Sequence, residues 1–349
     1  MNPYTLKTRS RALFAASLLV TLAACGGGGG SSSQSGNSAE TPTTPPPTGS
    51  VTPENSAAVA SASYKSALGL LNSTFLGLDV AANPSGSTTP LATASPMGMA
   101  VPNLRLSMKR GLAGIPVGAA SNQTEVACSK GGTLLLSVTD VNGNQDLDAG
   151  DSLSIDYRLC ATNTAISNGK VDFRVTEYSQ TSAESIVDVT LTYTALNIRT
   201  TGGLEYQYDG DIRLRAIEST SNNSTQMTVS GTRYAYRINN RTVTLSNYNN
   251  TVNIYGDQTF EYTVRGVVAD SADSEAFTIS TPTPLRGMIN GNYPRSGKLQ
   301  VAGSRTGTLA VTVREGTPES VGVLLQLDAG NDGVFEWSKS LTWAELEAS

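Results

Sequence analysis

The residues best suited to chemistry in this chain form a short acidic loop at positions 140–151. Its sequence is Asp140-Val-Asn-Gly-Asn-Gln-Asp-Leu-Asp-Ala-Gly-Asp151, with oxygen-bearing side chains at nearly every second position. Calcium binds six to eight oxygen ligands, and a loop that wraps the ion supplies them from alternate positions. The four aspartates of the loop also repel one another, and a cation relieves that repulsion. The pattern predicts a calcium site formed by Asp140, Asn142, Asn144, Asp146, Asp148 and Asp151.

The spacing of these residues resembles the calcium loop of EF-hand and dockerin proteins over its whole length. The resemblance implies a backbone-carbonyl ligand from Asp146, and a direct or water-mediated ligand from Asp148. It implies side-chain coordination by the residues at positions 1, 3, 5 and 12, which are Asp140, Asn142, Asn144 and Asp151.

Two residues depart from the family pattern. Gln145 stands at position 6, where glycine normally makes the sharp turn, although Gly143 lies close enough to displace that turn. Asp151 ends the loop with a shorter side chain than the usual bidentate glutamate. We therefore expect weak binding, in the range of about 10⁻⁴ to 10⁻³ M typical of extracellular modules. The alternative is a solvated turn, which Asp, Asn and Gly form without a metal.

A second acidic loop lies near the end of the sequence. Asp328, Asp332 and Glu336 occupy positions 1, 5 and 9 of a similar pattern. Gly330 replaces the carboxylate at position 3, however, and Lys339 stands at position 12. This loop is the weaker metal candidate, and its pattern favours a tight turn.

Two cysteines flank the first acidic loop. Strand-like segments at Thr133–Thr139 and Ser152–Leu159 lie between the loop and Cys128 and Cys160, so a hairpin would place the cysteines opposite each other. We expect a disulfide, which closes a loop of about thirty residues and stabilises the fold by roughly 3–4 kcal/mol. A free pair or a metal site is the alternative, but the chain has no histidine to complete a zinc site.

The missing histidine also limits catalysis. Ser-His-Asp and Cys-His nucleophile systems are excluded, as are His-ligated metals. A carboxylate-dependent hydrolase remains an alternative, although no aspartate or glutamate stands out as paired outside the two acidic loops. We therefore expect that the protein is not an enzyme.

The N-terminus carries a targeting signal. A basic segment precedes the apolar run Ala12–Ala24, which is short for a membrane span and has the length of a signal-peptide core. The run ends in Leu22-Ala-Ala-Cys25, which resembles the lipobox of bacterial lipoproteins. The resemblance implies cleavage before Cys25, which then receives a diacylglycerol and an N-acyl chain such as palmitate. Two or more acyl chains suffice for stable anchoring in a membrane.

The predicted mature chain is acidic. Removing residues 1–24 removes three of the 24 basic residues and none of the 29 acidic residues, so the net charge falls from −5 to −8. An acidic chain without basic blocks binds nucleic acid poorly, and we expect no such partner. Gly26 follows the cysteine at the position where aspartate retains lipoproteins at the inner membrane, so we expect an outer-membrane address in a Gram-negative cell. The sequence leaves open whether the domain faces the periplasm or the cell exterior.

Composition and periodicity divide the chain into five regions. Apolar residues recur at helical spacing within 54–80, for example at Tyr64, Leu68 and Leu71. The predicted regions are a signal peptide (1–24), a lipidated Gly/Ser/Pro tether (25–53), an amphipathic helix (54–80), a loose linker (81–126) and an antiparallel β domain (127–349).

The β domain alternates with a period of two. In Leu204–Arg215 the even positions are apolar, aromatic or glycine, and the odd positions are charged or amide. Such strands have one solvent-exposed face, the wet face, and one buried face, the dry face, as in antiparallel sheets. Turn signals such as Asn168-Gly169 separate about ten predicted strands. The domain is therefore expected to be all-β, a long antiparallel meander curled into a barrel or half-barrel, with the N-terminal helix packed on or in it. A transmembrane barrel is disfavoured, since no aromatic girdle follows the strands.

The whole arrangement resembles a group of uncharacterised proteobacterial envelope lipoproteins, which implies no activity. Our first hypothesis is a non-enzymatic lipoprotein whose β domain serves binding or envelope architecture and has a structural calcium loop. The second is a carrier of lipid or another apolar ligand, similar in outline to the half-barrels of lipoprotein-localisation factors. A dry face filled with side chains favours the first hypothesis, and a hollow one favours the second.

Overall fold

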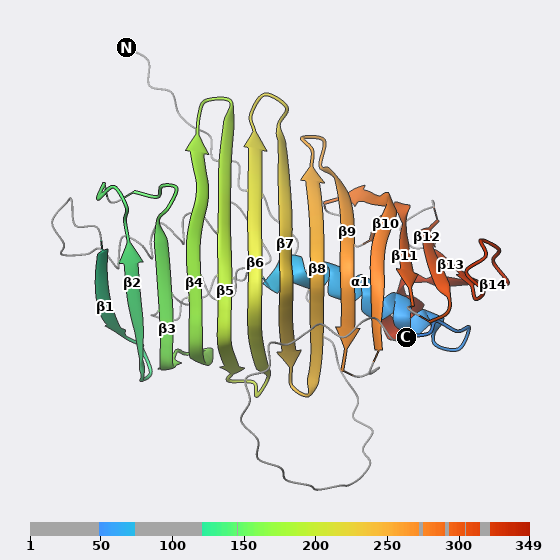
Figure 1. The fold of residues 1–349 in the computed structure, drawn as a ribbon, viewed down its shortest axis with the longest axis horizontal. Helices are drawn as coiled ribbons and strands as arrows, with labels where there is room; N and C mark the ends of the chain where they lie inside the picture. Colours follow the sequence, from blue (N-terminus) through green and yellow to red (C-terminus); the bar gives the residue numbers. More distant parts are fainter. Residues whose placement is uncertain are drawn as a thin grey trace, which may run out of the picture.

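The structure is a computed structural model that describes residues 49–73, 121–144, 146–271, 275–289, 293–303, 305–314 and 322–349. Its main element is one antiparallel sheet of fourteen strands, each hydrogen-bonded to the next strand in the chain (Figure 1). The predicted all-β meander is therefore confirmed, with fourteen strands in place of about ten. The predicted signal peptide, Cys25 and most of the tether lie outside the described residues.

The strands β1 to β14 follow the chain without a crossover. Their bounds are Ser121–Ala127, Thr133–Thr139, Ser152–Ala161, Ala165–Gln180, Glu184–Thr200, Glu205–Ser219, Ser224–Ile238, Arg241–Ile254, Thr259–Asp270, Glu275–Met288, Ser296–Ala302, Thr308–Val313, Gly322–Asp328 and Trp337–Thr342. The described helices are α1 (Ser56–Ser73) and α4 (Trp343–Ala348).

The strand β1 corrects one predicted boundary. Residues 81–126 were expected to form a linker, but Ser121–Ala127 pairs with β2 along its whole length. This segment is polar and lacks the apolar alternation of the longer strands, and among the described strands it is the first of the sheet and pairs with β2 alone. The part of the linker before residue 121 lies outside the described residues, as do residues 74–80 of the predicted helix.

The alternation of the sequence sets the two faces of the sheet. In β2, buried leucine and valine side chains alternate with more exposed threonine, leucine and serine side chains. The same alternation continues through β3 and β4, where Ile155, Val171 and Phe173 are all buried. The strands from β2 to β13 therefore contribute alternating side chains to one continuous apolar core.

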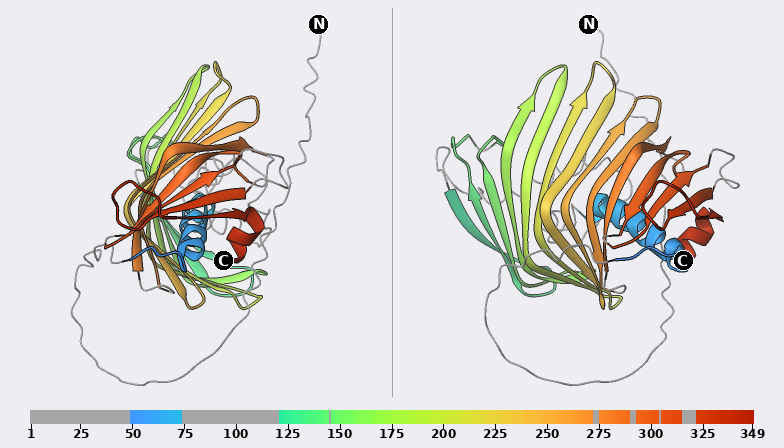
Figure 2. Two further views of the ribbon diagram at one scale, coloured as in Figure 1. Left: turned by 90° about the vertical axis from the view of Figure 1, so that its right-hand side faces the viewer. Right: turned by 45° about the vertical axis from the view of Figure 1, so that its right-hand side comes forward.

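The sheet curls into an open half-barrel because most of its long strands are interrupted (Figure 2). Shifts of register occur in the pairings of consecutive strands from β3 to β7 and from β8 to β11. They leave extra residues such as Leu159, Ala195 and Asn247. These three residues have positive φ angles of 50°, 46° and 47°. A bulge bends its strand and increases the local twist, so a series of them curves the sheet.

The expected turn at Asn168-Gly169 is one of these interruptions and does not end a strand. Both residues lie inside β4, where the pairing with β5 shifts register. Gly169 has a φ of 109°, and a Cβ atom there would lie 2.3 Å from the carbonyl oxygen of Ala195. The dipeptide was wrongly interpreted as a turn, since a glycine bulge and a hairpin turn require the same residue type.

The two helices cover one part of the dry face. The helix α1 lies inside the curve and contacts β9, β11, β12, β13 and α4 (Figure 2). Buried Tyr64 of α1 meets Trp343 of α4 with ring centroids 5.0 Å apart, and Tyr293 stacks on Trp343 at 4.9 Å. A capping box between Thr342 and Glu345 begins α4. Neither described helix is long and apolar enough to cross a membrane.

Candidate metal centres

The first acidic loop connects β2 to β3, which pair in register from Thr133↔Arg158 to Thr139↔Ser152. At the other end of this hairpin Cys128 and Cys160 form a disulfide, with their Cα atoms 5.4 Å apart. The hairpin therefore has a covalent link at its base and the acidic loop at its tip.

The two end residues of the loop are buried. The side chain of Asp140 accepts a hydrogen bond of 2.7 Å from the backbone of Gly143. Asp151 accepts bonds from the backbone N–H groups of Val141 (2.9 Å) and Asp148 (2.7 Å). Leu147, at the position of the apolar anchor, is also buried. Both end carboxylates therefore stabilise the turn of the backbone directly.

Side chains in the middle of the loop form hydrogen bonds with other groups of the same loop. The amide nitrogens of Asn142 and Asn144 donate to the same oxygen of Asp148, at 2.8 and 2.6 Å. The side-chain oxygens of these asparagines accept bonds from backbone N–H groups two residues ahead, including that of Asp146. Gly143 has a φ of 70°, so a left-handed residue lies three positions after the start of the loop. Gln145 lies outside the described residues.

Charge is crowded around Asp151. Burial raises the pKa of its carboxyl group, as do the neighbouring charges of Asp140 and Asp148, and the two backbone N–H groups oppose the shift only in part. A cation within the loop would favour the ionised carboxylate. The ligand types fit calcium, but among the described residues the three carboxylates with converging oxygens belong to the second loop.

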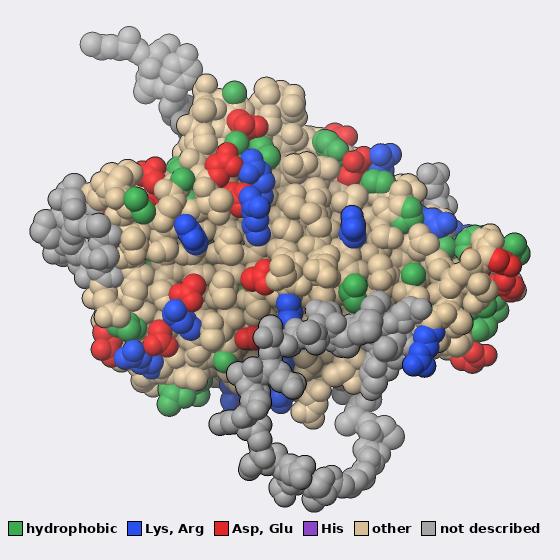
Figure 3. Space-filling view, viewed as in Figure 1, with side chains coloured by type: hydrophobic (Ala, Val, Ile, Leu, Met, Phe, Trp, Pro, Cys, Tyr) green, Lys and Arg blue, Asp and Glu red, His purple; other side chains and the backbone are tan. Residues whose placement is uncertain are grey.

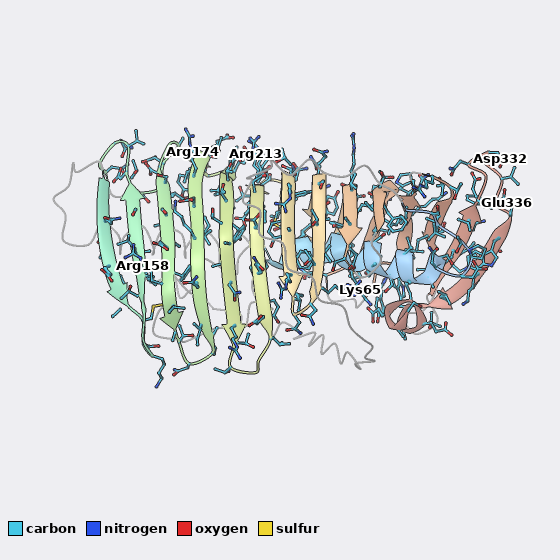
Figure 4. All side chains as sticks on the ribbon, turned by 60° about the horizontal axis from the view of Figure 1, so that its bottom comes forward. Lys65, Arg158, Arg174, Arg213, Asp332 and Glu336 are labelled. Carbon is cyan, nitrogen blue, oxygen red and sulfur yellow. A yellow bond between two sulfur atoms is a disulfide. The ribbon has the colours of Figure 1, made fainter. Side chains whose placement is uncertain are left out.

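The second acidic loop connects β13 to β14 at the opposite end of the sheet (Figure 4). Oxygen atoms of Asp328, Asp332 and Glu336 all lie within 4.8 Å of one another. Asp328 ends β13 and is buried, and the other two side chains are exposed. Among the described residues, this is the group of three acidic side chains that could hold a metal ion.

Hydrogen bonds fix the second loop as well. The two oxygens of Asp328 accept from the backbone of Asp332 (3.1 Å) and of Gly333 (2.8 Å). Glu336 accepts from the backbone of Ala329 at 2.8 Å. Gly333 stands at position 6 with a φ of 88°, as a sharp turn at that position requires. The carboxylate group fits a hard cation such as calcium, which prefers oxygen ligands.

The middle of the dry face is filled with tyrosine rings. Tyr193, Tyr208 and Tyr234 come from β5, β6 and β7, and their side chains are buried. Their ring centroids lie 5.9–6.4 Å apart, so each ring contacts the other two. Burial raises the pKa of Tyr193 and Tyr208 above the ordinary tyrosine value. Gly210 lies opposite both Tyr193 and Tyr234, where a side chain would collide with the carbonyl oxygen of Arg233.

Sequence reasoning missed one charged cluster on the wet face. The buried carboxylate of Asp188 accepts two hydrogen bonds from Arg213, at 2.9 and 2.7 Å, and one of 3.1 Å from Arg215. Arg215 also pairs with Glu177 at 2.6 Å. Burial opposes ionisation of Asp188, but the two guanidinium groups hold its pKa below the usual range. The sequence does show two arginines on solvent-facing positions of β6. Their acidic partner on β5 could be identified only once the pairing of β5 with β6 was known.

Comparisons with known proteins gave no match. A scan against protein-family models, a search of curated proteins and a search of solved structures each found none.

Proposed function

We propose that this chain is a non-enzymatic lipoprotein of the Gram-negative outer membrane, in which the curled β domain serves binding or envelope architecture. Cys25 is its lipidation site in this proposal, because the apolar run and the residues before it match a lipobox. The residues after it form a tether rich in glycine, serine and proline, which holds the domain at a distance from the membrane.

The observation that supports this proposal over a carrier is the filled dry face. Tyr193, Tyr208 and Tyr234 are at most 3% exposed and occupy the centre of that face in mutual contact. Contacting rings in a buried layer are a core, and they stabilise the sheet beyond the area that they bury. A binding function then belongs to the exposed surfaces of the sheet.

The amount of apolar ligand that co-purifies with the protein distinguishes a filled core from a carrier. The full chain with Cys25→Ser, purified without its lipid anchor, is examined by native mass spectrometry and by uptake of an environment-sensitive apolar dye. We expect the mass of the polypeptide alone and no saturable dye uptake. Co-purified lipid, released by denaturation, would overturn the proposal in favour of the carrier.

The lipid anchor needs its own test. Cells that express the wild-type chain are labelled with radioactive palmitate and compared with cells that express Cys25→Ser. We expect label in the wild-type protein only, and recovery of that protein in the outer-membrane fraction. A labelled Cys25→Ser variant, or an unlabelled wild-type protein, contradicts lipidation at this residue.

We further propose that calcium stabilises the domain through the acidic loops. The convergence of Asp328, Asp332 and Glu336 within 4.8 Å favours the second loop as the tighter site. Full-length protein is titrated with calcium after chelation, and its melting temperature is recorded. We expect a saturable rise, and a melting curve that is insensitive to both chelator and calcium contradicts the proposal.

A further inference from the structure

The wet face of the sheet has a continuous row of side chains that crosses the strands. Directly paired residues on successive strands define it, and we call it the arginine row. Its members are Ser152, Arg174, Thr190, Arg213, Ser230, Asn249, Arg265 and Ser280. Three arginines therefore stand on β4, β6 and β9, separated by hydroxyl and amide side chains. The row runs from β3 to β10, perpendicular to the strands.

The arginines of the row are available at the surface. Arg174 and Arg265 have neither a hydrogen-bond nor an ion-pair partner among the described residues. The side chain of Arg213 is bound to Asp188 but remains 53% exposed. Arg174 and Arg213 point away from the same face of the sheet (Figure 4), and basic side chains lie across the middle of this face (Figure 3).

Neighbouring carboxylates of the wet face do not neutralise Arg174 or Arg265. Asp172 is paired with Lys170 at 2.8 Å, and Asp188 with Arg213 and Arg215. The row is thus locally positive although the whole chain is acidic. A negatively charged partner is attracted to it, and an apolar partner gains nothing from it.

Two surface concavities lie on the row. One has a volume of about 650 Å³ and is lined by Ser152, Arg174 and Thr190, among others. The second, of about 480 Å³, is lined by Asn249, Arg265 and further polar residues. The first concavity is also lined by Asp172, whose carboxylate is paired with Lys170. Each concavity has one guanidinium group beside several hydroxyl or amide groups, which together can bind a carboxylate and its neighbouring hydroxyls.

We propose that the arginine row binds an extended acidic saccharide, a chain of uronic-acid type that lies across the strands. Single arginines match monoanionic carboxylates, whereas a phosphate carries up to two charges and is usually bound by clustered arginines. Aromatic side chains that would stack on nucleic-acid bases are absent from the described members of the row. The hydroxyl and amide groups between the arginines fit the many hydroxyls of a sugar chain.

The length of the row adds a requirement on the ligand. Arg174 on β4 and Arg265 on β9 are separated by five strand spacings, or about 24 Å if the sheet were flat. A disaccharide cannot contact both arginines, and a longer chain can. Affinity should therefore rise with chain length until the row is spanned, because the second contact becomes intramolecular.

This inference rests on the proposed binding function of the β domain. The full chain with Cys25→Ser is titrated into fluorescently labelled oligogalacturonates of graded length, at low ionic strength and with chelator to exclude calcium bridging. We expect binding that tightens with length and weakens in salt. Arg174→Gln and Arg265→Gln should each weaken it about fivefold, and the double variant more.

A matched variant outside the row controls for the loss of positive charge. Arg199→Gln removes the same charge from an exposed arginine of β5 that lies nine residues from Thr190, about 30 Å along the strand, and should leave binding unchanged. The variants should melt like the parent, because the replaced guanidinium groups have no partner among the described residues. No binding, equal loss in Arg199→Gln, or equal affinity for polyglutamate or single-stranded DNA would overturn the inference. Each of these failures leaves the lipid-anchor and ligand-content tests unaffected.

Discussion

The two acidic loops at opposite ends of the sheet contain the same residue types but arrange their carboxylates differently. In the β2–β3 loop, the spacing matches a calcium loop at six positions, yet its buried carboxylates bond to the backbone of the loop itself. In the β13–β14 loop the spacing matches poorly, yet oxygens of Asp328, Asp332 and Glu336 approach within 4.8 Å. As candidate metal sites, the first loop is therefore favoured by the spacing of its residues and the second loop by the positions of its oxygen atoms.

The strands that enter each loop explain the difference. Asp328 is the last residue of β13, so the sheet fixes its direction, and Glu336 follows only eight positions later, beside the start of β14. The longer first loop has room for asparagine side chains to bond neighbouring backbone groups and Asp148. Both loops bond carboxylates to their own backbone, but among the described residues the shorter loop is the one that also brings three carboxylates together.

The largest expected effect on stability comes from removing the disulfide, which encloses the first acidic loop and not the second. The double variant Cys128→Ala, Cys160→Ala should lower the free energy of unfolding by about 3–4 kcal/mol, because the unfolded chain regains the entropy of an open loop. Urea denaturation of the full chain measures this. Ion binding at the second loop should be unchanged, and a parallel loss there would show that the two sites are not independent.

The second prediction removes the carboxylates at the ends of the first loop. Asp140→Ala with Asp151→Ala leaves the N–H groups of Gly143, Val141 and Asp148 without their acceptors. We expect a loss of about 2 kcal/mol even in chelator, since these bonds form without a metal. The melting temperature in chelator measures it.

Asn142→Ala is the control for this pair, because it removes an exposed side chain of the same loop. It should change stability by less than about 0.5 kcal/mol. If the double variant is equally mild in chelator, the buried carboxylates do not hold the loop without a metal.

A smaller effect on stability is expected at the second loop. Asp332 is exposed, so Asp332→Asn should change the free energy of unfolding by less than about 0.5 kcal/mol in chelator. It should weaken ion binding roughly tenfold or more, because it removes one of three converging charges. Terbium luminescence excited through Trp337, the residue after Glu336, reports this site. An unchanged terbium affinity would exclude Asp332 as a ligand.

The fold was largely predictable because alternation is a local property. Each long strand places alternating residues on the dry face over most of its length, as Val171 and Phe173 do in β4. Alternation together with the turn signals between the strands predicts an antiparallel meander. The bulges were not predictable in the same way. Asn168-Gly169 was interpreted as a turn, since only the partner strand shows that the chain continues through it.

The sequence predicted which residues form the candidate metal centres, but not how their side chains are arranged in space. The acidic residues and the cysteine pair were evident from spacing, whereas the convergence of Asp328, Asp332 and Glu336 depends on where β13 ends and β14 begins. The arginine row was invisible for the same reason. Arg174 and Arg265 are ninety-one positions apart, and only the strand register places them in one row.

The smallest expected effect is a dependence on pH that belongs to the first loop. The pKa of Asp151 is raised in the folded protein, so the folded state holds its proton more tightly than the unfolded chain. In chelator, stability should therefore fall as pH rises from about 4, the pKa of an unfolded aspartate, through the raised folded value. Asp151→Asn should remove this decline, and calcium should suppress it by favouring the ionised form.

Asp188 provides the opposite sign within the same molecule. Its pKa is lowered, despite burial, by Arg213 and Arg215, so its contribution is present above about pH 4 and is lost as pH falls through the lower folded value. Urea midpoints measured across this range for Asp151→Asn and Asp188→Asn should therefore diverge from the parent in opposite directions. If the parent in chelator shows no decline above pH 4, the carboxylate of Asp151 is not destabilised by its neighbours, and the first loop needs no cation to hold it ionised.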